Sequence, residues 1–445
     1  MDRKHNILRW LATVAGVMAV STVQADTLID AIHSALENNP EISIMQAGAG
    51  AAHLGVAEAK AGYYPSVSLR YTRSSEYSNT PSTRSSTGGS ITLDPYEMSV
   101  TVNQMLWDGG LVSSRVAGAS ANSQAAHADL LNTAETIASQ TAKLYLEVLK
   151  QKDLLKEAEE YLEVQNKILK LVQERVMHRV APTSDVGEVE SRKKTAEAAI
   201  TTAKGDLEYA IASFEALVGD EVGEPQPSAI TQIEFDSNPQ TAMEFGLKNS
   251  PIIKSAKSRV ESTRAVEKEK KAAFMPDIAL NLKATNDLDL SGTPGTSRVQ
   301  TGMIVVNYNI FAGFGDLKKK QSASLLRRQA EYTLDREIRT YKAQLKKNLS
   351  ALKTAQKRKE IFTSQVIENE KVRDTFNEQF SVGRKTLFNL LDVEQSLFNS
   401  KNNMITEKYS VTLAGYNLLA TQGLLLKTLG ANTPKAEKPR YKLFF

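Results

Sequence analysis

The sequence predicts a mainly α-helical chain that also carries transmembrane β-strands and is built as a two-fold internal repeat. Segments 176–190 and 380–394 align without a gap, and long helical patterns flank both, so each is expected to be the turn of a helical hairpin. Segment 38–65 is echoed at one constant offset by 249–276, with proline at matching places. A period of nearly half the chain is too long for a solenoid and indicates two equivalent halves.

Each half is expected to contain a helix, a pair of strands and a helical hairpin. We place the first repeat at 26–219, a linker at 220–240, the second repeat at 241–430 and a basic tail at 431–445. The strand pairs and hairpin tips are expected at about 66–107 and 178–185 in the first repeat, and at about 277–311 and 381–386 in the second.

The N-terminus has the three-part pattern of an export signal. Basic residues precede an apolar run over 10–20, and Val-Gln-Ala ends at Ala25, which predicts a signal peptide over 1–25. The chain has no cysteine, so we expect neither a disulfide nor a lipid-bearing cysteine anchor.

Charge and motif content exclude several functional classes. Without the signal, 52 Lys and Arg remain against 50 Asp and Glu, which gives no support for nucleic-acid binding. The histidines are scattered without metal-ligand spacing, and no nucleotide motif or catalytic constellation is found. We therefore expect no cofactor, no metal and no enzymatic activity.

The strands alternate apolar and polar residues. Val67, Leu69 and Tyr71 alternate with polar neighbours, a Ser/Thr/Gly-rich loop is expected over 74–90, and a second alternating strand follows it. In the second repeat the return strand is expected over about 298–311. Strands of about ten residues can cross an outer membrane, but four cannot close a barrel, so several identical chains are expected to share one. The alternative is a pair of soluble surface hairpins with a buried face.

Long helices surround these strands. We expect one helix over 28–61, capped by Asp26 or Thr27, and returning helices over 185–217 and 387–429. Leucine and valine recur every seven residues before the first tip, which is coiled-coil spacing. The hydrophobic row is Val148, Leu155, Leu162, Leu169 and Val176, with Leu154, Tyr161 and Ile168 in an adjacent row. About 65 helical residues span close to 100 Å.

The duplicated order of motifs resembles the TolC-type outer-membrane export ducts over nearly all of the mature chain. The matching motifs are Asn39-Pro40, Tyr64-Pro65, Met275-Pro276, Trp107-Asp108-Gly109-Gly110, and Ser381-Val382-Gly383 through Asp392-Val393. The resemblance implies a homotrimer in the outer membrane of a Gram-negative bacterium, with a shared twelve-stranded barrel and a helical tunnel across the periplasm. It also implies a periplasmic adaptor protein and an inner-membrane ABC transporter or proton-driven pump as partners.

The resemblance further implies a constriction at the second hairpin tip. Family members carry acidic residues three apart there, where this chain has Asn389 and Asp392, so the preference of the constriction for cations should be weaker. Polar links between the tips, with Lys385 to Ser184 or Asp185 as the expected pair, are implied to hold the gate closed. Arg384 completes this set. The alternative is that these are ordinary capping and surface residues.

Two further sets of residues follow from the same pattern. The adaptor is expected to dock at the tips, and proline and glycine are expected at the helix-strand junctions. The docking residues are Val180, Ala181, Val382 and Gly383, and the junction residues are Pro65, Gly109, Gly110, Pro276 and Gly313.

The predicted function is that of a passive outer-membrane duct energised by its partners. The missing lipid anchor and the short basic tail favour type I protein secretion of an adhesin or toxin, and multidrug or small-molecule efflux is the alternative. A non-channel periplasmic coiled-coil scaffold is the alternative from another class.

Overall fold

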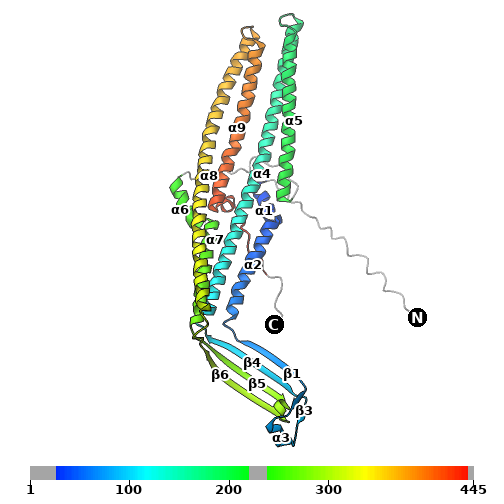
Figure 1. Ribbon diagram of the computed structural model, residues 1–445. Helices are drawn as coiled ribbons and strands as arrows, with labels where there is room; N and C mark the ends of the chain where they lie inside the picture. Colours follow the sequence, from blue (N-terminus) through cyan, green and yellow to red (C-terminus); the bar gives the residue numbers. More distant parts are fainter. Residues whose placement is uncertain (1–26, 220–237, 439–445) are drawn as a thin grey trace, which may run out of the picture.

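The computed structural model describes residues 27–219 and 238–438, and the expected signal peptide and nearly all of the expected linker lie outside these ranges. A long body of helices carries a β-sheet at one end and two helical hairpin tips at the other (Figure 1). The two chain halves therefore run side by side along one axis.

The first repeat begins with Thr27, whose side chain accepts the backbone N–H of Asp30 and caps the first helix. Its elements are α1 (Leu28–Asn38), α2 (Pro40–Ala61), β1 (Ser66–Arg73), β2 (Glu76–Ser78), α3 (Pro81–Thr87), β3 (Ile91–Leu93), β4 (Tyr96–Trp107), α4 (Leu111–Met177) and α5 (Ser184–Val218). The helix expected over 28–61 is thus two helices, because Asn39 caps α2 and Pro40 starts it.

The second repeat has the same order of long elements. They are α6 (Pro239–Asn249), α7 (Pro251–Lys271), η2 (Ala272–Phe274), β5 (Asp277–Leu288), η3 (Leu290–Gly292), β6 (Thr296–Asn307), α8 (Gly315–Ser381), α9 (Leu387–Gln422) and α10 (Leu425–Leu429). The helix expected over 387–429 breaks at Gly423, which has a positive φ of 72° and lies against Pro251, so that a Cβ there would meet the proline Cδ at 2.5 Å.

The loop expected over 74–90 is instead a small ordered unit of β2, α3 and β3. Thr80 and Thr83 form a reciprocal capping box, and Gly88 ends the helix in the left-handed conformation. The unit packs on the β5–β6 turn, where the Glu76 carboxylate accepts the Ser291 backbone N–H at 3.2 Å. Capping residues within the Ser/Thr-rich stretch were the signal for this helix.

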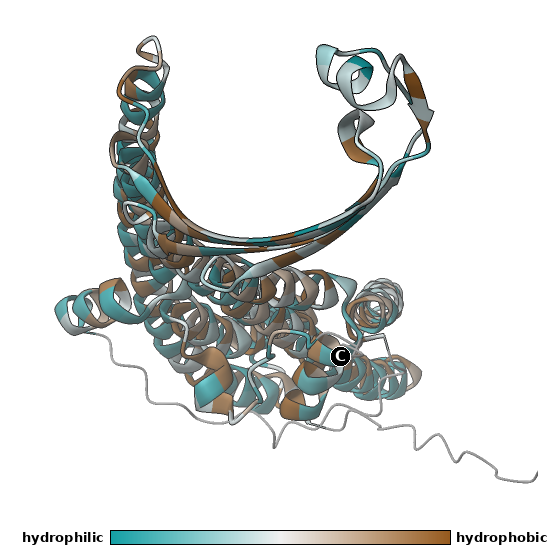
Figure 2. Cartoon of the chain, turned by 90° about the horizontal axis from the view of Figure 1, so that it is seen from below, coloured by the Kyte–Doolittle hydropathy of each residue, from teal (hydrophilic) through white to brown (hydrophobic). Residues whose placement is uncertain are grey.

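The four long strands form one antiparallel sheet in the order β1-β4-β5-β6. Leu69 pairs with Val100, and Val100 pairs with Ala284, so one apolar face continues across the strands. The sheet is a strongly curved band (Figure 2). β6 ends at Asn307, short of the expected 311, because its last partner is Asp277 and Pro276 precedes it. The outer edges of β1 and β6 have no strand partner among the described residues.

The tunnel helices lie in the order α5, α4, α9, α8 near the tips (Figure 1), with α4 packed on both α5 and α9. α4 and α8 each have 67 residues, about 100 Å of helix. Tyr161 and Ile168 are buried, whereas Leu162 and Leu169 are only half-buried. Between residues 161 and 169, the row that contains Tyr161 and Ile168 is therefore buried more deeply in the α4 seam than the row that contains Leu162 and Leu169.

The C-terminal segment, expected to be irregular and solvated, has no helix or strand over 431–438 but is packed onto the helical body. The Glu437 N–H donates to the carbonyl of Gln46 at 3.1 Å, and Ala431 is buried. A Cβ at Gly50 would meet the Glu437 carbonyl oxygen at 2.4 Å, so glycine is what allows this contact. The remaining residues, 439–445, lie outside the described part.

A buried carboxyl ties α4 to α10 at mid-height. Glu135 is 6% exposed and accepts the Leu425 N–H at 3.1 Å. Burial raises the pKa of Glu135 from 4.5 to about 7, although the backbone donors of Leu426 and Leu425 oppose this rise. In the pH window between these values the folded chain holds a proton that the unfolded chain has lost.

We predict that stability falls as pH rises from about 4.5 to 7, because the native state binds the extra proton. Glu135→Gln keeps an acceptor for Leu425 and should remove a pH-dependent component of about 1 to 3 kcal/mol. Thermal unfolding at pH 5 and pH 7.5 measures this component. Glu163→Gln, at an exposed carboxylate, is the control and should keep the full pH dependence. An unchanged pH dependence in Glu135→Gln would contradict the assignment.

Candidate functional site

The two hairpin tips are built alike at the C-terminal ends of α4 and α8. The Val180 N–H donates to the Arg175 carbonyl and the Arg384 N–H to the Gln379 carbonyl, each at 2.8 Å. Arg179 and Gly383 occupy equivalent places with positive φ, 58° and 76°. Both turns therefore have the Schellman-type end of a helix, and only the second has the glycine that this conformation favours.

The predicted gate residues lie around the second tip. Asn389 shares a capping box with Thr386, whose hydroxyl donates to Asn389 Oδ1 at 2.7 Å and accepts the Asn389 N–H. The Asn389 amide thus stabilises the start of α9. Asp392, one turn further along α9, is exposed. Its carboxylate is therefore accessible at the surface of the tip.

The basic residues of this tip are held differently. The Lys385 ammonium lies 4.2 Å from the centre of the Phe376 ring on its own hairpin, and Arg384 is exposed. Ser184 and Asp185 begin α5, whose cap residue Thr183 makes no side-chain cap hydrogen bond. Within one protomer Lys385 therefore contacts its own hairpin.

The expected docking residues include two exposed valines. Val180 and Val382 are 65% and 69% exposed, and Gly383 is exposed beside Val382. Ala181 is half-buried. The two tips thus present apolar side chains to their surroundings at the end of the helical body.

Arg175 joins the two hairpins, a role that was not predicted from the sequence. Its Nη1 donates to the Phe380 carbonyl at 3.0 Å, and its guanidinium lies 4.6 Å from the centre of the Phe380 ring. Around this contact the hairpins share an apolar cluster with Val189, Leu387 and Leu391. An arginine in the last turn before a repeated tip was the only sequence signal for this contact.

Between the tips and the sheet, side-chain contacts connect α4 to α9 at several positions along the helices. The Tyr161 hydroxyl donates to Gln395 Oε1 at 2.9 Å, and the Tyr161 ring stacks on Phe398. Further contacts are Glu157 with Lys401 at 3.3 Å, and Asp153 with both Lys408 at 3.0 Å and the Tyr409 hydroxyl at 2.8 Å. We call this set the α4–α9 ladder. It joins the first hairpin to the second by polar contacts.

A buried carboxyl and a buried amide lie next to the ladder, Glu394 beside Gln395 on α9 and Gln165 one turn past Tyr161 on α4. Glu394 is 7% exposed, and burial raises its pKa while Arg373 and Lys401 act against the rise. Gln165 is fully buried, and neither its nitrogen nor its oxygen has a hydrogen-bond partner in the described chain. A buried amide without hydrogen-bond partners, such as that of Gln165, is destabilising at this level of the α4 seam.

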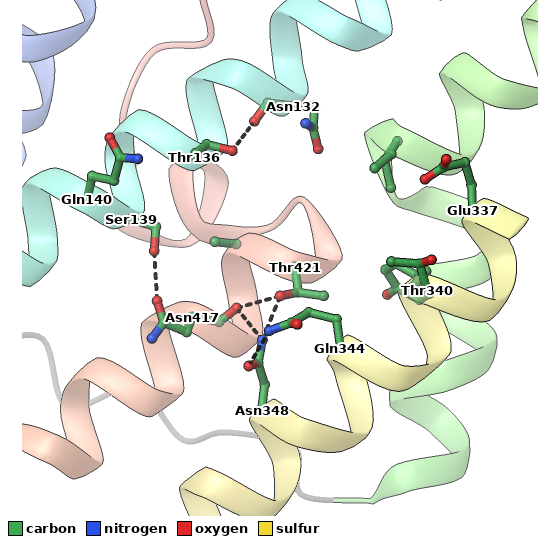
Figure 3. A pocket seen from close by; sticks show the side chains of 13 residues that line it. Asn132, Thr136, Ser139, Gln140, Glu337, Thr340, Gln344, Asn348, Asn417 and Thr421 are labelled. Carbon is green, nitrogen blue, oxygen red and sulfur yellow. Dashed lines mark hydrogen bonds between the residues drawn. The ribbon is translucent and has the colours of Figure 1, made fainter.

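A polar pocket lies where α4, α8 and α9 meet, and Glu337 is among the residues that line it (Figure 3). Ser139 Oγ donates to Asn417 Oδ1 at 2.8 Å, and Asn348 Nδ2 donates to Thr421 Oγ1 at 2.7 Å. Side-chain amides and hydroxyls line most of it. Among residues 27–219 and 238–438 there is no cluster of His, Cys, Asp and Glu suited to a metal ion.

The helix-strand junctions use glycine and proline as expected from their geometry. Gly109 and Gly110 have φ of 66° and 87°, and a Cβ at Gly109 would meet the Met275 Cβ at 2.6 Å. The Asp108 carboxylate accepts the N–H groups of Gly110, Leu111 and Val112, which caps α4. In the second repeat Gly313 also has a positive φ, while Pro65 and Pro276 precede β1 and β5.

Comparison with known proteins identifies the family. The model of the outer membrane efflux protein family matches residues 31–220 and 246–424, one match in each repeat. The chain belongs to this family, which includes TolC. It is therefore an outer-membrane efflux channel of a Gram-negative bacterium with a helical extension in the periplasm, and it is not an enzyme.

Individual relatives are distant but match over most of their length. "Outer membrane efflux protein BepC" of Brucella suis biovar 1 (strain 1330) is 23% identical over 408 residues, which is 92% of this chain and 87% of BepC. "Alkaline protease secretion protein AprF" of Pseudomonas aeruginosa is 22% identical over 462 residues, 98% of this chain and 93% of AprF. A solved structure of CusC is 15% identical, with a TM-score of 0.76 and coverage of 90% and 92%.

These comparisons confirm the predicted fold class of long helices with a four-stranded sheet and two repeats. None of the described helices is long and apolar enough to cross a membrane. The residues proposed for the gate and for adaptor docking stay predictions.

Proposed function

We propose that three copies of the chain form a passive duct in which the sheets close a shared twelve-stranded barrel and the helices form a tunnel. The observation that carries this proposal is that the outer edges of β1 and β6, at opposite sides of a strongly curved sheet (Figure 2), have no strand partner among the described residues. Open edges are not tolerated in lipid, and cyclic repetition removes them. Channels of this family are trimeric and act with tripartite pumps, which supports the same assembly.

In this trimer the tips form the periplasmic gate. The exposed position of Asp392 supports a ring of three carboxylates around the passage, with Asn389 in place of a second ring. Because Lys385 contacts its own hairpin within a protomer, we assign its link with Ser184 or Asp185 to neighbouring protomers. Arg175 and the α4–α9 ladder tie the two hairpins of one protomer and so favour the closed state.

The partners proposed are a periplasmic adaptor protein and an inner-membrane ABC transporter or proton-driven pump. The adaptor would dock on the tips through Val180, Ala181, Val382 and Gly383, and the exposure of the two valines supports an apolar contact there. The duct itself supplies no energy.

For cargo, we propose type I protein secretion. The support is AprF, which is named for secretion of an alkaline protease and matches 98% of this chain. Small-molecule efflux is the second candidate, because BepC is named an efflux protein.

Deletion of the gene distinguishes protein secretion from small-molecule efflux. We expect a protein to disappear from the culture medium while drug tolerance is unchanged, and the reverse outcome would favour efflux.

Single-channel recording in planar bilayers tests the duct and its constriction. We expect wild-type protein to form cation-preferring channels, and Asp392→Ala to lower the cation-to-anion permeability ratio about two- to threefold, because a ring of charge is removed. Asn389→Asp should raise this ratio by a similar factor. The control is Glu368→Gln, whose carboxylate pairs with Lys371 at 2.8 Å on α8 and should leave the ratio unchanged.

If both tip variants keep the wild-type ratio in conducting channels, the constriction lies elsewhere. If the purified protein forms no channels at all, the duct itself is ruled out and the scaffold alternative gains.

A further inference from the structure

A strongly basic run occupies the exposed side of α8. Between Glu337 and Glu360 there are eight Lys and Arg and no Asp or Glu, and all eight are exposed. Two of them have ion-pair partners: Arg358 with Glu407 at 2.6 Å and Lys357 with Glu360 at 3.1 Å. Lys353 has no ion-pair partner in the described chain. Like charges so closely spaced repel one another unless an anion faces them.

A complementary acidic surface lies at the opposite edge of the same protomer. Glu208 and Glu215 are seven residues apart on α5 and therefore lie on one side of it. Glu208 is five residues past the buried Ala203, which places this side away from the α4 seam. Neither carboxylate forms an ion pair with a described residue.

Side-chain contacts between neighbouring helices show that the two charged surfaces lie at one height. Arg358 of α8 meets Glu407 of α9, the next residue Lys408 meets Asp153 of α4, and Asp153 is eight residues past Tyr145, whose ring packs on Phe214 of α5. Counting five residues back from Arg358 along α8, and the same number forward along the antiparallel α5, sets Lys353 level with residues 210 and 211, between Glu208 and Glu215. Lys353 thus lies at the height of the Glu208–Glu215 side.

Small residues on both edges allow the two helices to approach closely. Ala198, Gly205 and Ala212 recur every seven residues on α5, and all three are exposed. On α8, Ala343, Ser350 and Ser364 are exposed at multiples of seven. Small side chains reduce the distance between helix axes, so a lysine could reach carboxylates across such a contact.

We propose that Lys353 of one protomer binds Glu208 and Glu215 of the next, and that this α8–α5 contact is the electrostatic seam of the assembly. The occupant of both surfaces is a second copy of this chain, because α8 and α5 lie at opposite edges of the protomer (Figure 1), on the same sides as the open strands β6 and β1. The inference rests on the proposed trimer and names the residues that join it.

Cross-linking tests the register of the seam, and the chain offers a cysteine-free background. We expect Lys353→Cys with Ala212→Cys to give covalent trimers on denaturing gels after treatment of the full-length assembly with a short bismaleimide. The control pair is Arg339→Cys with Ala212→Cys. Arg339 lies two heptads before Lys353 on the same side of α8, about 21 Å away along the helix, and should give none.

Charge reversal tests the energetics. Lys353→Glu should raise the monomer fraction of the purified assembly about tenfold, because three equivalent seams are weakened at once. The triple variant Lys353→Glu, Glu208→Lys, Glu215→Lys should return this fraction to near the wild-type value. Arg339→Glu, beyond the level at which α5 ends, should have little effect.

The outcomes separate the two proposals. Trimers without the 353–212 cross-link, or a Lys353→Glu assembly as stable as wild type, overturn the seam and leave the duct standing. Protein that is monomeric before any substitution overturns the trimer itself.

Discussion

The structure depends on one constraint: a single chain has open edges on both sides. Among the described residues, β1 and β6 each have an outer edge without a strand partner, and Lys353 of α8 and Glu208 and Glu215 of α5 form no ion pair. In the hydrocarbon layer an unpaired backbone group costs several kcal/mol, whereas an exposed helix face in water costs little. The strands therefore require the assembly, and the helices determine how its protomers fit together.

The internal repeat gives each protomer two hairpins with different properties. The turns share their hydrogen bonds, yet the first has Arg179 in the left-handed position where the second has Gly383. The second hairpin starts α9 with a complete capping box, while α5 starts without a side-chain cap. Between them lie an apolar cluster with Val189, Leu387 and Leu391 near the tips and the polar α4–α9 ladder, and Glu394 and Gln165 are buried polar groups. Such a seam is suited to opening without loss of the fold.

Much of the architecture could be predicted from the sequence because it depends on periodicity. Alternation marked the strands and heptads marked α4, whereas the start of α2 at Pro40 was missed. Breaks that depend on tertiary contact were missed: Gly423 ends α9 where Pro251 lies, and α3 forms within a stretch whose composition suggested a loop. The packing of Glu437 on α2 likewise leaves no local sequence signal.

For the candidate site, the sequence located the tips but not their contacts. Asn389 and Asp392 could be named from spacing and resemblance, whereas Arg175 could not, because its partner Phe380 lies 205 residues away. The same limit applies to the proposed contact between protomers, since Lys353 has no ion-pair partner among the described residues of its own chain. Long-range pairs of single residues carry no periodic signal, so only coordinates reveal them.

The mass of the detergent-extracted particle, measured by light scattering with the detergent contribution removed, tests the central claim most directly. A shared barrel predicts a particle with about three times the mass of one chain, which is 48.8 kDa before removal of the predicted signal peptide. A particle with one chain, in protein that is folded and extracted from the outer membrane, would contradict the account.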